Sequence, residues 1–144
     1  MRGNRISPNF TFAEFTKSDT AKAHHINNAI TDWDVRDNII ALVQNILQPA
    51  RDAWEEPMFI NSGYRCKELN ELVGGVESSQ HRKGQAADVD VSDPYEFARL
   101  VKKMNLPYDQ MIIYPTFVHL SYKRDGENRG QLLYNKRWKG SKDL

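Results

Sequence analysis

The sequence predicts an α+β fold in which a small antiparallel sheet packs against helices. Two patterns indicate this class. One long stretch carries apolar residues at helical spacing, and several short stretches alternate apolar and polar residues as half-buried strands do. A chain of 144 residues, 40% hydrophobic and 27% charged, can bury one core. We expect a single domain over residues 1–144, with its core from about residue 10 to about residue 135 and a frayed tail after Trp138.

The first part of the chain is expected to be helical. Thr11 or Asn9 can open a short helix through Phe12 and Phe15, because their side-chain oxygens can accept hydrogen bonds from the first turn. Ser18 is a typical N-cap for a second short helix.

Residues 33–54 predict the main core helix. Apolar residues recur there at helical spacing and define one buried stripe: Val35, Ile39, Leu42, Val43, Ile46 and Leu47. Pro49 should kink or divide this helix, because proline lacks a backbone donor and its ring clashes with the preceding turn.

The rest of the chain predicts the sheet and two more helices. The expected strands cover residues 58–60, 86–91, 110–113, 117–122 and 131–134, and the last three are expected to be antiparallel. One helix covers residues 67–73 and ends at Gly74-Gly75, and another begins at Asp93-Pro94. Residues 122–130 are polar and contain glycine, which favours an exposed loop over the alternative of a groove wall.

Charge and cysteine content exclude several classes of protein. A formal net charge of +1 argues against electrostatic binding to nucleic acid. Cys66 is the only cysteine, so neither an internal disulfide nor a thiolate metal cluster can form. No apolar run is long enough to span a bilayer, and polar residues such as Arg2 and Arg5 interrupt any signal-peptide core. We expect a monomer that is made in the cytoplasm without a signal peptide and has no membrane partner.

Two imidazoles and a carboxylate form the most informative pattern. His81 lies in a polar loop, Asp88 lies on one face of the strand at 86–91, and His119 points away from Val118 and Leu120 on the strand at 117–122. These side chains can therefore converge. Two histidines and one carboxylate suit a catalytic zinc ion that keeps its fourth position open, although nickel, cobalt or iron could bind the same groups.

Three short motifs surround these residues: Ser62-Gly63-Tyr64-Arg65, His81-x-x-Gly84-x-Ala86-x-Asp88 and Val118-His119-Leu120-Ser121. In these motifs the chain resembles the zinc D-Ala-D-Ala carboxypeptidases and L-alanyl-D-glutamate endopeptidases, which are related to the Hedgehog signalling domain. The resemblance covers roughly residues 10–122.

The resemblance implies a Hedgehog/DD-peptidase-like fold that binds one zinc ion per chain through His81, Asp88 and His119. It also implies that Arg65 contacts the substrate near the scissile bond, and we expect Ser79 and Gln80 to bind substrate too. The implied function is hydrolysis of a peptide bond in the stem peptide of bacterial peptidoglycan. A phage endolysin or a bacterial cell-wall hydrolase would act in this way after release by lysis, or as part of a virion.

One expected catalytic group is missing. Members of this family place Glu, Asp or His a few residues before the last histidine ligand as the general base, but residues 112–118 contain none of these. Asp109, Tyr114 and Asp90 are the candidates for proton transfer. The alternative interpretation is a zinc-binding or structural module of the same fold with weak or no catalytic activity.

Overall fold

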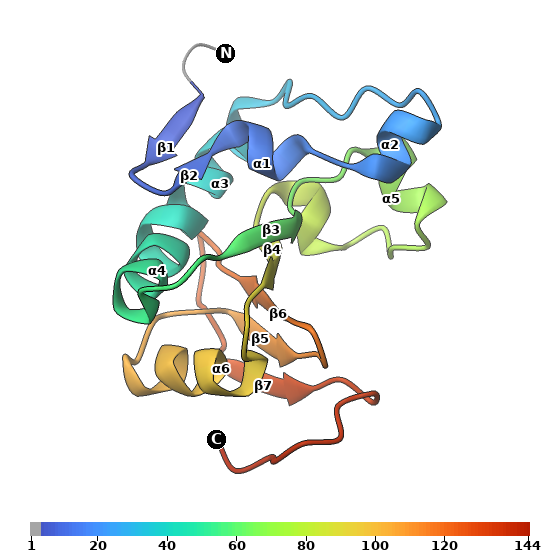
Figure 1. Ribbon diagram of the computed structural model, residues 1–144. Helices are drawn as coiled ribbons and strands as arrows, with labels where there is room; N and C mark the ends of the chain where they lie inside the picture. The colour runs from blue at the N-terminus through green and yellow to red at the C-terminus, as the bar shows by residue number, and fades with distance from the viewer. Residues whose placement is uncertain (1–3) are drawn as a thin grey trace.

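Five strands form the main sheet of the computed structural model, which describes residues 4–144, in the order β3-β4-β6-β5-β7 (Figure 1). The strands are β3 (Phe59–Ser62), β4 (Ala86–Asp90), β5 (Gln110–Ile113), β6 (Phe117–Ser121) and β7 (Gln131–Tyr134). Helices pack against this sheet, so the predicted α+β class is confirmed. A short hairpin of β1 (Arg5–Ser7) and β2 (Phe10–Thr11) precedes them and was not predicted.

The predicted antiparallel pairing is wrong for β7. β5 and β6 are antiparallel, but β7 runs parallel to β5, from Gln110 opposite Gln131 to Ile113 opposite Tyr134. β6 already has β4 on one side and β5 on the other. The chain that leaves β6 therefore has no free edge of β6 to pair with, and residues 122–130 carry it to the outer edge of β5.

Short helices in the first part of the chain form where caps were predicted. Thr11 is the N-cap of α1 (Phe12–Thr16), and the Glu14 carboxylate accepts hydrogen bonds of 3.1 Å from the Thr11 backbone N–H and hydroxyl, as in a capping box. The Ser18 hydroxyl accepts a hydrogen bond of 3.1 Å from the backbone N–H of Ala21 and caps α2 (Asp19–Ala23). Two further helices, α5 (Lys67–Leu72) and α6 (Pro94–Lys103), lie close to their predicted positions.

The long core helix is divided in the segment before its proline. α3 (Trp33–Leu42) continues into the π-helical turn η1 (Val43–Leu47), which leads into α4 (Gln48–Trp54). Pro49 lies in the first turn of α4, where its missing N–H is least costly. The Asn45 amide group donates to the Ala41 carbonyl at 2.8 Å and satisfies that acceptor within the widened turn.

The core lies on one face of the sheet. All six residues of the predicted helical stripe are buried, and so are Val89, Val118 and Leu120 on the facing strands. Phe97 and Val101 of α6 extend this layer. Because strand side chains alternate between faces, Asp88 and His119 lie on the opposite face of the sheet.

The segment after Trp138, for which a frayed tail was predicted, contacts α6 in the structure. The Trp138 ring stacks on Tyr95 of α6, with 6.3 Å between ring centroids and 4° between ring planes. Its indole N–H donates to the Ser141 carbonyl at 2.8 Å. An aromatic side chain that can reach a second ring gives this tail a docking contact that a polar composition alone does not reveal.

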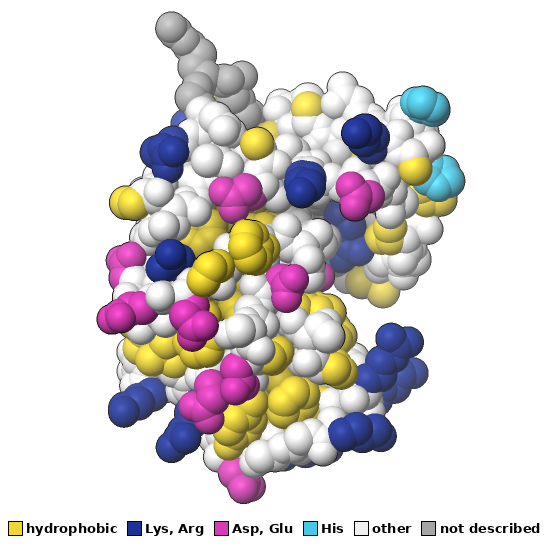
Figure 2. All heavy atoms as spheres, viewed as in Figure 1, with side chains coloured by type: hydrophobic (Ala, Val, Ile, Leu, Met, Phe, Trp, Pro, Cys, Tyr) yellow, Lys and Arg dark blue, Asp and Glu magenta, His cyan; other side chains and the backbone are white. Residues whose placement is uncertain are grey.

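Surface charge is unevenly distributed despite the near-zero net charge. On the face shown in Figure 2, acidic side chains lie mainly over α4 and α6, and basic side chains gather at the lower right, beside the segment after β7. Across residues 4–144, no helix is both long enough and apolar enough to cross a membrane.

Gly84 joins the 3-10 turn η2 (Gln80–Lys83) to β4 and lies against α3. Its φ is +74°, and a Cβ atom there would lie 2.7 Å from the Val35 carbonyl oxygen. Gly74 has a similar φ of +77° but has no heavy atom within 4 Å of such a Cβ. Both glycines therefore adopt a left-handed backbone conformation, but only Gly84 is closely packed.

We expect Gly84→Ala to lower the free energy of unfolding clearly more than Gly74→Ala. The left-handed conformation costs an alanine about 1–2 kcal/mol at either position, and only Gly84→Ala also forces η2 away from α3. Urea denaturation of both variants measures the difference. Equal losses would show that the contact between η2 and α3 contributes nothing.

Candidate metal centre

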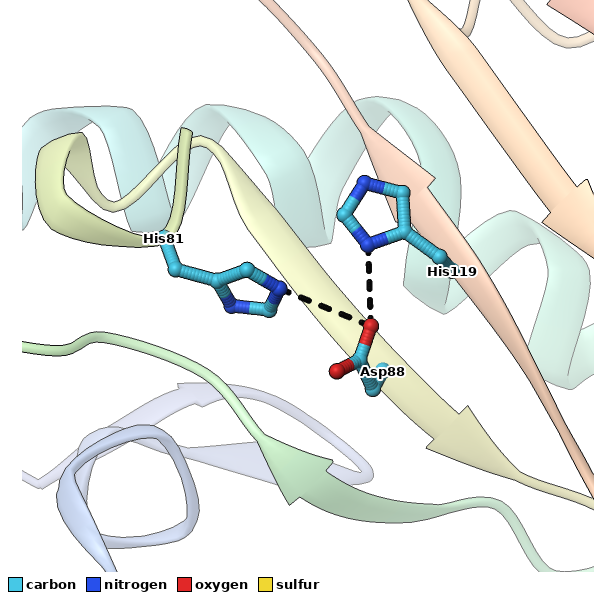
Figure 3. Close-up of side chains that lie close together, drawn as sticks. All are labelled: His81, Asp88 and His119. Carbon is cyan, nitrogen blue, oxygen red and sulfur yellow. Dashed lines mark hydrogen bonds and ion pairs between the residues drawn. The ribbon is translucent and has the colours of Figure 1, made fainter. Parts of the chain in front are cut away.

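Three elements bring His81, Asp88 and His119 together (Figure 3). His81 lies in η2, Asp88 in the middle of β4, and His119 directly opposite Asp88 in β6. His119 Nδ1 lies 2.9 Å from Asp88 Oδ1, and His81 Nε2 lies 3.5 Å from the same oxygen. Figure 3 shows both imidazoles turned toward that oxygen. The convergence predicted from strand alternation is therefore present.

The donor atoms are spaced as a metal site requires. One ligand atom from each residue lies within 4.8 Å of the other two. Zinc–nitrogen distances of about 2.0–2.1 Å place neighbouring ligand atoms of a tetrahedral site roughly 3.4 Å apart. The observed separations of 2.9 and 3.5 Å lie on either side of that value. Two imidazoles and one carboxylate thus fit a divalent ion of the zinc type.

Backbone contacts orient the His81 ring. Its Nδ1 lies 2.8 Å from the Gly63 carbonyl oxygen. Because a carbonyl only accepts, Nδ1 donates to it, and Nε2 is the ring nitrogen that faces Asp88. The Ser79 hydroxyl accepts from the His81 backbone N–H at 3.2 Å and caps η2. The Arg65 N–H donates to the His81 carbonyl at 3.0 Å.

The Asp88 carboxyl group is held in its ionised form. Burial raises its pKa, but hydrogen bonds from His119 and His81 outweigh that effect, so the pKa lies well below the usual range for aspartate. An ionised carboxylate is the form that ligates a metal.

A cavity of about 670 Å³ opens over these residues. It is lined by Arg65, Gly75, Val76, Ser78, Ser79, Gln80, His81, Lys83, Gln85, Asp88, Gln110, Ile112, Tyr114, His119, Lys123 and Arg129. The predicted substrate contacts Arg65, Ser79 and Gln80 are all in this wall. A second cavity of about 400 Å³ shares Arg65 and Asp88 with the first. Arg65 and Asp88 thus form part of the wall of both cavities.

Arg65 reaches the cavity from the loop after β3. Burial lowers the pKa of its guanidinium, and the nearby Asp88 carboxylate partly offsets this. Its buried Nε–H has no hydrogen-bond partner among residues 4–144. Arg65 lines both cavities, so its guanidinium group can meet a ligand there.

Asn28 is a positioning residue that the sequence did not reveal. Its side chain is buried and bridges both neighbours of Arg65: Nδ2 donates to the Tyr64 carbonyl at 2.9 Å, and Oδ1 accepts from the Cys66 N–H at 2.8 Å. Nothing in the sequence pattern around Asn28 signals these contacts, because the residues lie far apart along the chain.

The three candidates for proton transfer lie in different places. Tyr114 lines the cavity, stacked on Phe117. Asp109 is fully buried outside the cavity lining and is paired with Arg129. Asp90 lies at the end of β4 and lines a separate hollow with Phe59. The structure thus brings Tyr114 into the cavity wall with His119 and does not bring Asp90 or Asp109 there.

A family model described as Peptidase M15 matches residues 8–121, which is most of the chain. No curated protein matches the sequence.

We expect the protein to bind one divalent metal ion per chain, and the His81→Ala, His119→Ala double variant to lose it. Removing two of three donors leaves one carboxylate, which cannot hold a zinc ion in competition with water. Metal analysis of the purified proteins measures the occupancy. His24→Ala is the matched control, because His24 is exposed at the end of α2. Full occupancy in the double variant would place the metal elsewhere.

Proposed function

Because this chain belongs to the peptidase M15 family, we propose that it is a zinc-dependent hydrolase that cuts a peptide bond in the stem peptide of bacterial peptidoglycan. Membership makes it a metallopeptidase with a peptidoglycan-type substrate. The convergence of His81, Asp88 and His119 in the wall of a peptide-sized cavity is the observation that carries the proposal. A phage endolysin or a bacterial cell-wall hydrolase would have this activity.

His81 and His119 would hold the zinc ion through Nε2 and Nδ1, with Asp88 as the third ligand. A zinc ion bound there supplies an activated water at neutral pH and polarises the scissile carbonyl. The Gly63 carbonyl fixes the His81 tautomer, and the β4–β6 pairing fixes the other two side chains. Orientation of the ligands is thus supplied by backbone contacts.

Arg65 would bind the substrate oxygen that becomes negative during the reaction. Its guanidinium group lies beside Asp88, is partly buried and lines both cavities. Charge-assisted hydrogen bonds from such a group stabilise a developing oxyanion more strongly than the neutral ground state.

Tyr114 is the group we propose for proton transfer or hydrogen-bond donation. It is the one candidate of the three that lines the cavity with His119. Burial, and to a lesser extent the Asp88 charge, raises the pKa of its hydroxyl, so the hydroxyl stays protonated at neutral pH. It therefore suits a donor to the oxyanion or to the leaving nitrogen better than a base.

The position of the two cavities supports cleavage within a chain. Both include Arg65 and Asp88 in their walls. A peptide that occupied both would continue on either side of the scissile bond. This arrangement favours an endopeptidase over a carboxypeptidase.

A weakly active binding module is the second candidate. Within the part of the chain that the structure describes, Asp88 is the only acidic residue in the cavity lining. A site without a separate carboxylate base can retain the metal and lose rate.

Release of amino groups from purified peptidoglycan separates these functions. We expect the zinc-loaded protein to release new amino groups and a chelator to abolish the release, with zinc addition restoring it. A zinc-loaded protein that binds peptidoglycan and releases nothing would establish the module instead.

We expect Arg65→Ala to retain metal and fold but to lose about 2–4 kcal/mol of transition-state stabilisation, or two to three powers of ten in kcat/KM. The reason is that the guanidinium contacts substrate and not the metal. Rates on peptidoglycan peptides and metal analysis measure the two effects. Arg99→Ala is the control, because Arg99 is an exposed residue of α6. An unchanged rate in Arg65→Ala would remove this residue from the site.

We expect Tyr114→Phe to lower kcat about a hundredfold or more with metal retained, because it removes only the hydroxyl. Asp90→Asn should keep the parent rate, since Asp90 lies in a different hollow. Steady-state kinetics on one peptide substrate compare the two variants. A full rate in Tyr114→Phe would assign proton transfer to another group.

A further inference from the structure

The loop between β6 and β7 carries two cations into the cavity wall. The polar composition of residues 122–130 predicts an exposed loop, but Lys123 and Arg129 both line the cavity. The loop is closed near its ends. The Lys123 N–H donates to Asn128 Oδ1 at 2.7 Å, Asn128 Nδ2 donates back to the Lys123 carbonyl at 3.1 Å, and the Gly130 N–H donates to the Tyr108 carbonyl at 3.1 Å. These bonds fix both cations against the sheet.

A buried carboxylate holds Arg129 in place. Asp109 is 0% exposed, and its Oδ1 accepts from the Arg129 backbone N–H at 3.0 Å and from Nε at 3.1 Å, while Oδ2 accepts from Nη2 at 2.8 Å. Lys123 Nζ lies 3.7 Å from Oδ1. Burial raises the pKa of Asp109, but the Arg129 bonds outweigh it and lower the pKa to about 2. Asp109 is therefore charged and fully engaged.

The cluster of Lys123, Asp109 and Arg129 has an excess of positive charge and hydrogen-bond donors that Asp109 does not occupy. Two cations face one carboxylate, so one positive charge is left over. A guanidinium has five N–H donors, and Asp109 receives two of them, which leaves three. The side chains of Arg129 and Lys123 are 51% and 35% exposed. If the Asp109–Arg129 ion pair served only to stabilise the fold, Lys123 would not be needed as a second cation at the cavity wall.

The net charge of the rest of the cavity wall is also positive. Arg65 and Lys83 also line it, and Asp88, already committed to the histidines, is the one acid among the described lining residues. The cavity therefore attracts an anion, and the Asp109 cluster offers it a preorganised, planar group of donors.

We propose that Lys123 and Arg129, positioned by Asp109, form a subsite that binds a carboxylate of the peptide substrate. This inference rests on the proposed function and specifies its substrate as an anionic peptide. A stem peptide offers two sources of the same chemistry, the free carboxylate of its glutamyl residue and its C-terminal carboxylate.

Three synthetic stem pentapeptides test the subsite: the free acid, an analogue with the glutamyl carboxylate amidated, and an analogue with an amidated C-terminus. We expect Lys123→Gln and Arg129→Gln each to lower kcat/KM on the free acid about tenfold or more, mainly through KM. On the analogue that lacks the recognised carboxylate, each variant should change kcat/KM less than twofold. That analogue identifies the source.

Two more variants separate positioning from folding. Asp109→Asn should raise KM on the free acid while kcat and metal content stay close to the parent, and it should lower the melting temperature, because Asp109 is buried in an ion pair. Arg124→Gln is the matched control, because Arg124 lies in the same loop but pairs with Asp34 and Asp37 of α3, outside the cavity wall. It should leave kinetics on all three peptides unchanged.

Equal losses on all three peptides in Lys123→Gln and Arg129→Gln, or no loss at all, would overturn the subsite while leaving the proposed hydrolase intact. A zinc-loaded parent that cleaves none of the peptides would instead overturn the proposed function, and the subsite with it.

Discussion

The pairing of β4 with β6 is the constraint on which the site depends. It sets Asp88 directly opposite His119 on one face and Val89 opposite Val118 on the other. Burial of both valines against the core helices fixes this register, because a slip of one residue would turn the apolar face outward. The hydrophobic core thus determines the position of two polar ligands, although neither ligand contributes to it.

Much of this arrangement could be predicted because it depends on local pattern. Alternation along β4 and β6 placed Asp88 and His119 on one face, and the apolar spacing of residues 33–54 identified the helical stripe that covers the other. Helix caps at Thr11 and Ser18 followed from side chains close to the turns that they cap. The convergence of His81, Asp88 and His119 was predictable for the same reason, since short motifs contain them.

What the sequence could not show depends on contacts between distant segments. The parallel course of β7 follows from which edge of β5 is free, which no local pattern records. Asp109 was predicted as a catalytic candidate because it is a carboxylate near the histidine strand. Its pairing with Arg129 depends on how the loop after β6 closes. Asn28 was missed because its partners, Tyr64 and Cys66, lie more than thirty positions away.

The three ligand segments are not held equally well without a metal ion. β4 and β6 form a continuous ladder, whereas η2 is a single 3-10 turn held by isolated contacts, such as the hydrogen bond from the Arg65 backbone N–H to the His81 carbonyl. An ion bound by all three would act as a reversible cross-link whose main effect is on η2. In hydrogen-exchange terms, the metal-free protein would open locally at this turn well before the sheet, so metal occupancy would control the lifetime of one turn more than the stability of the whole fold.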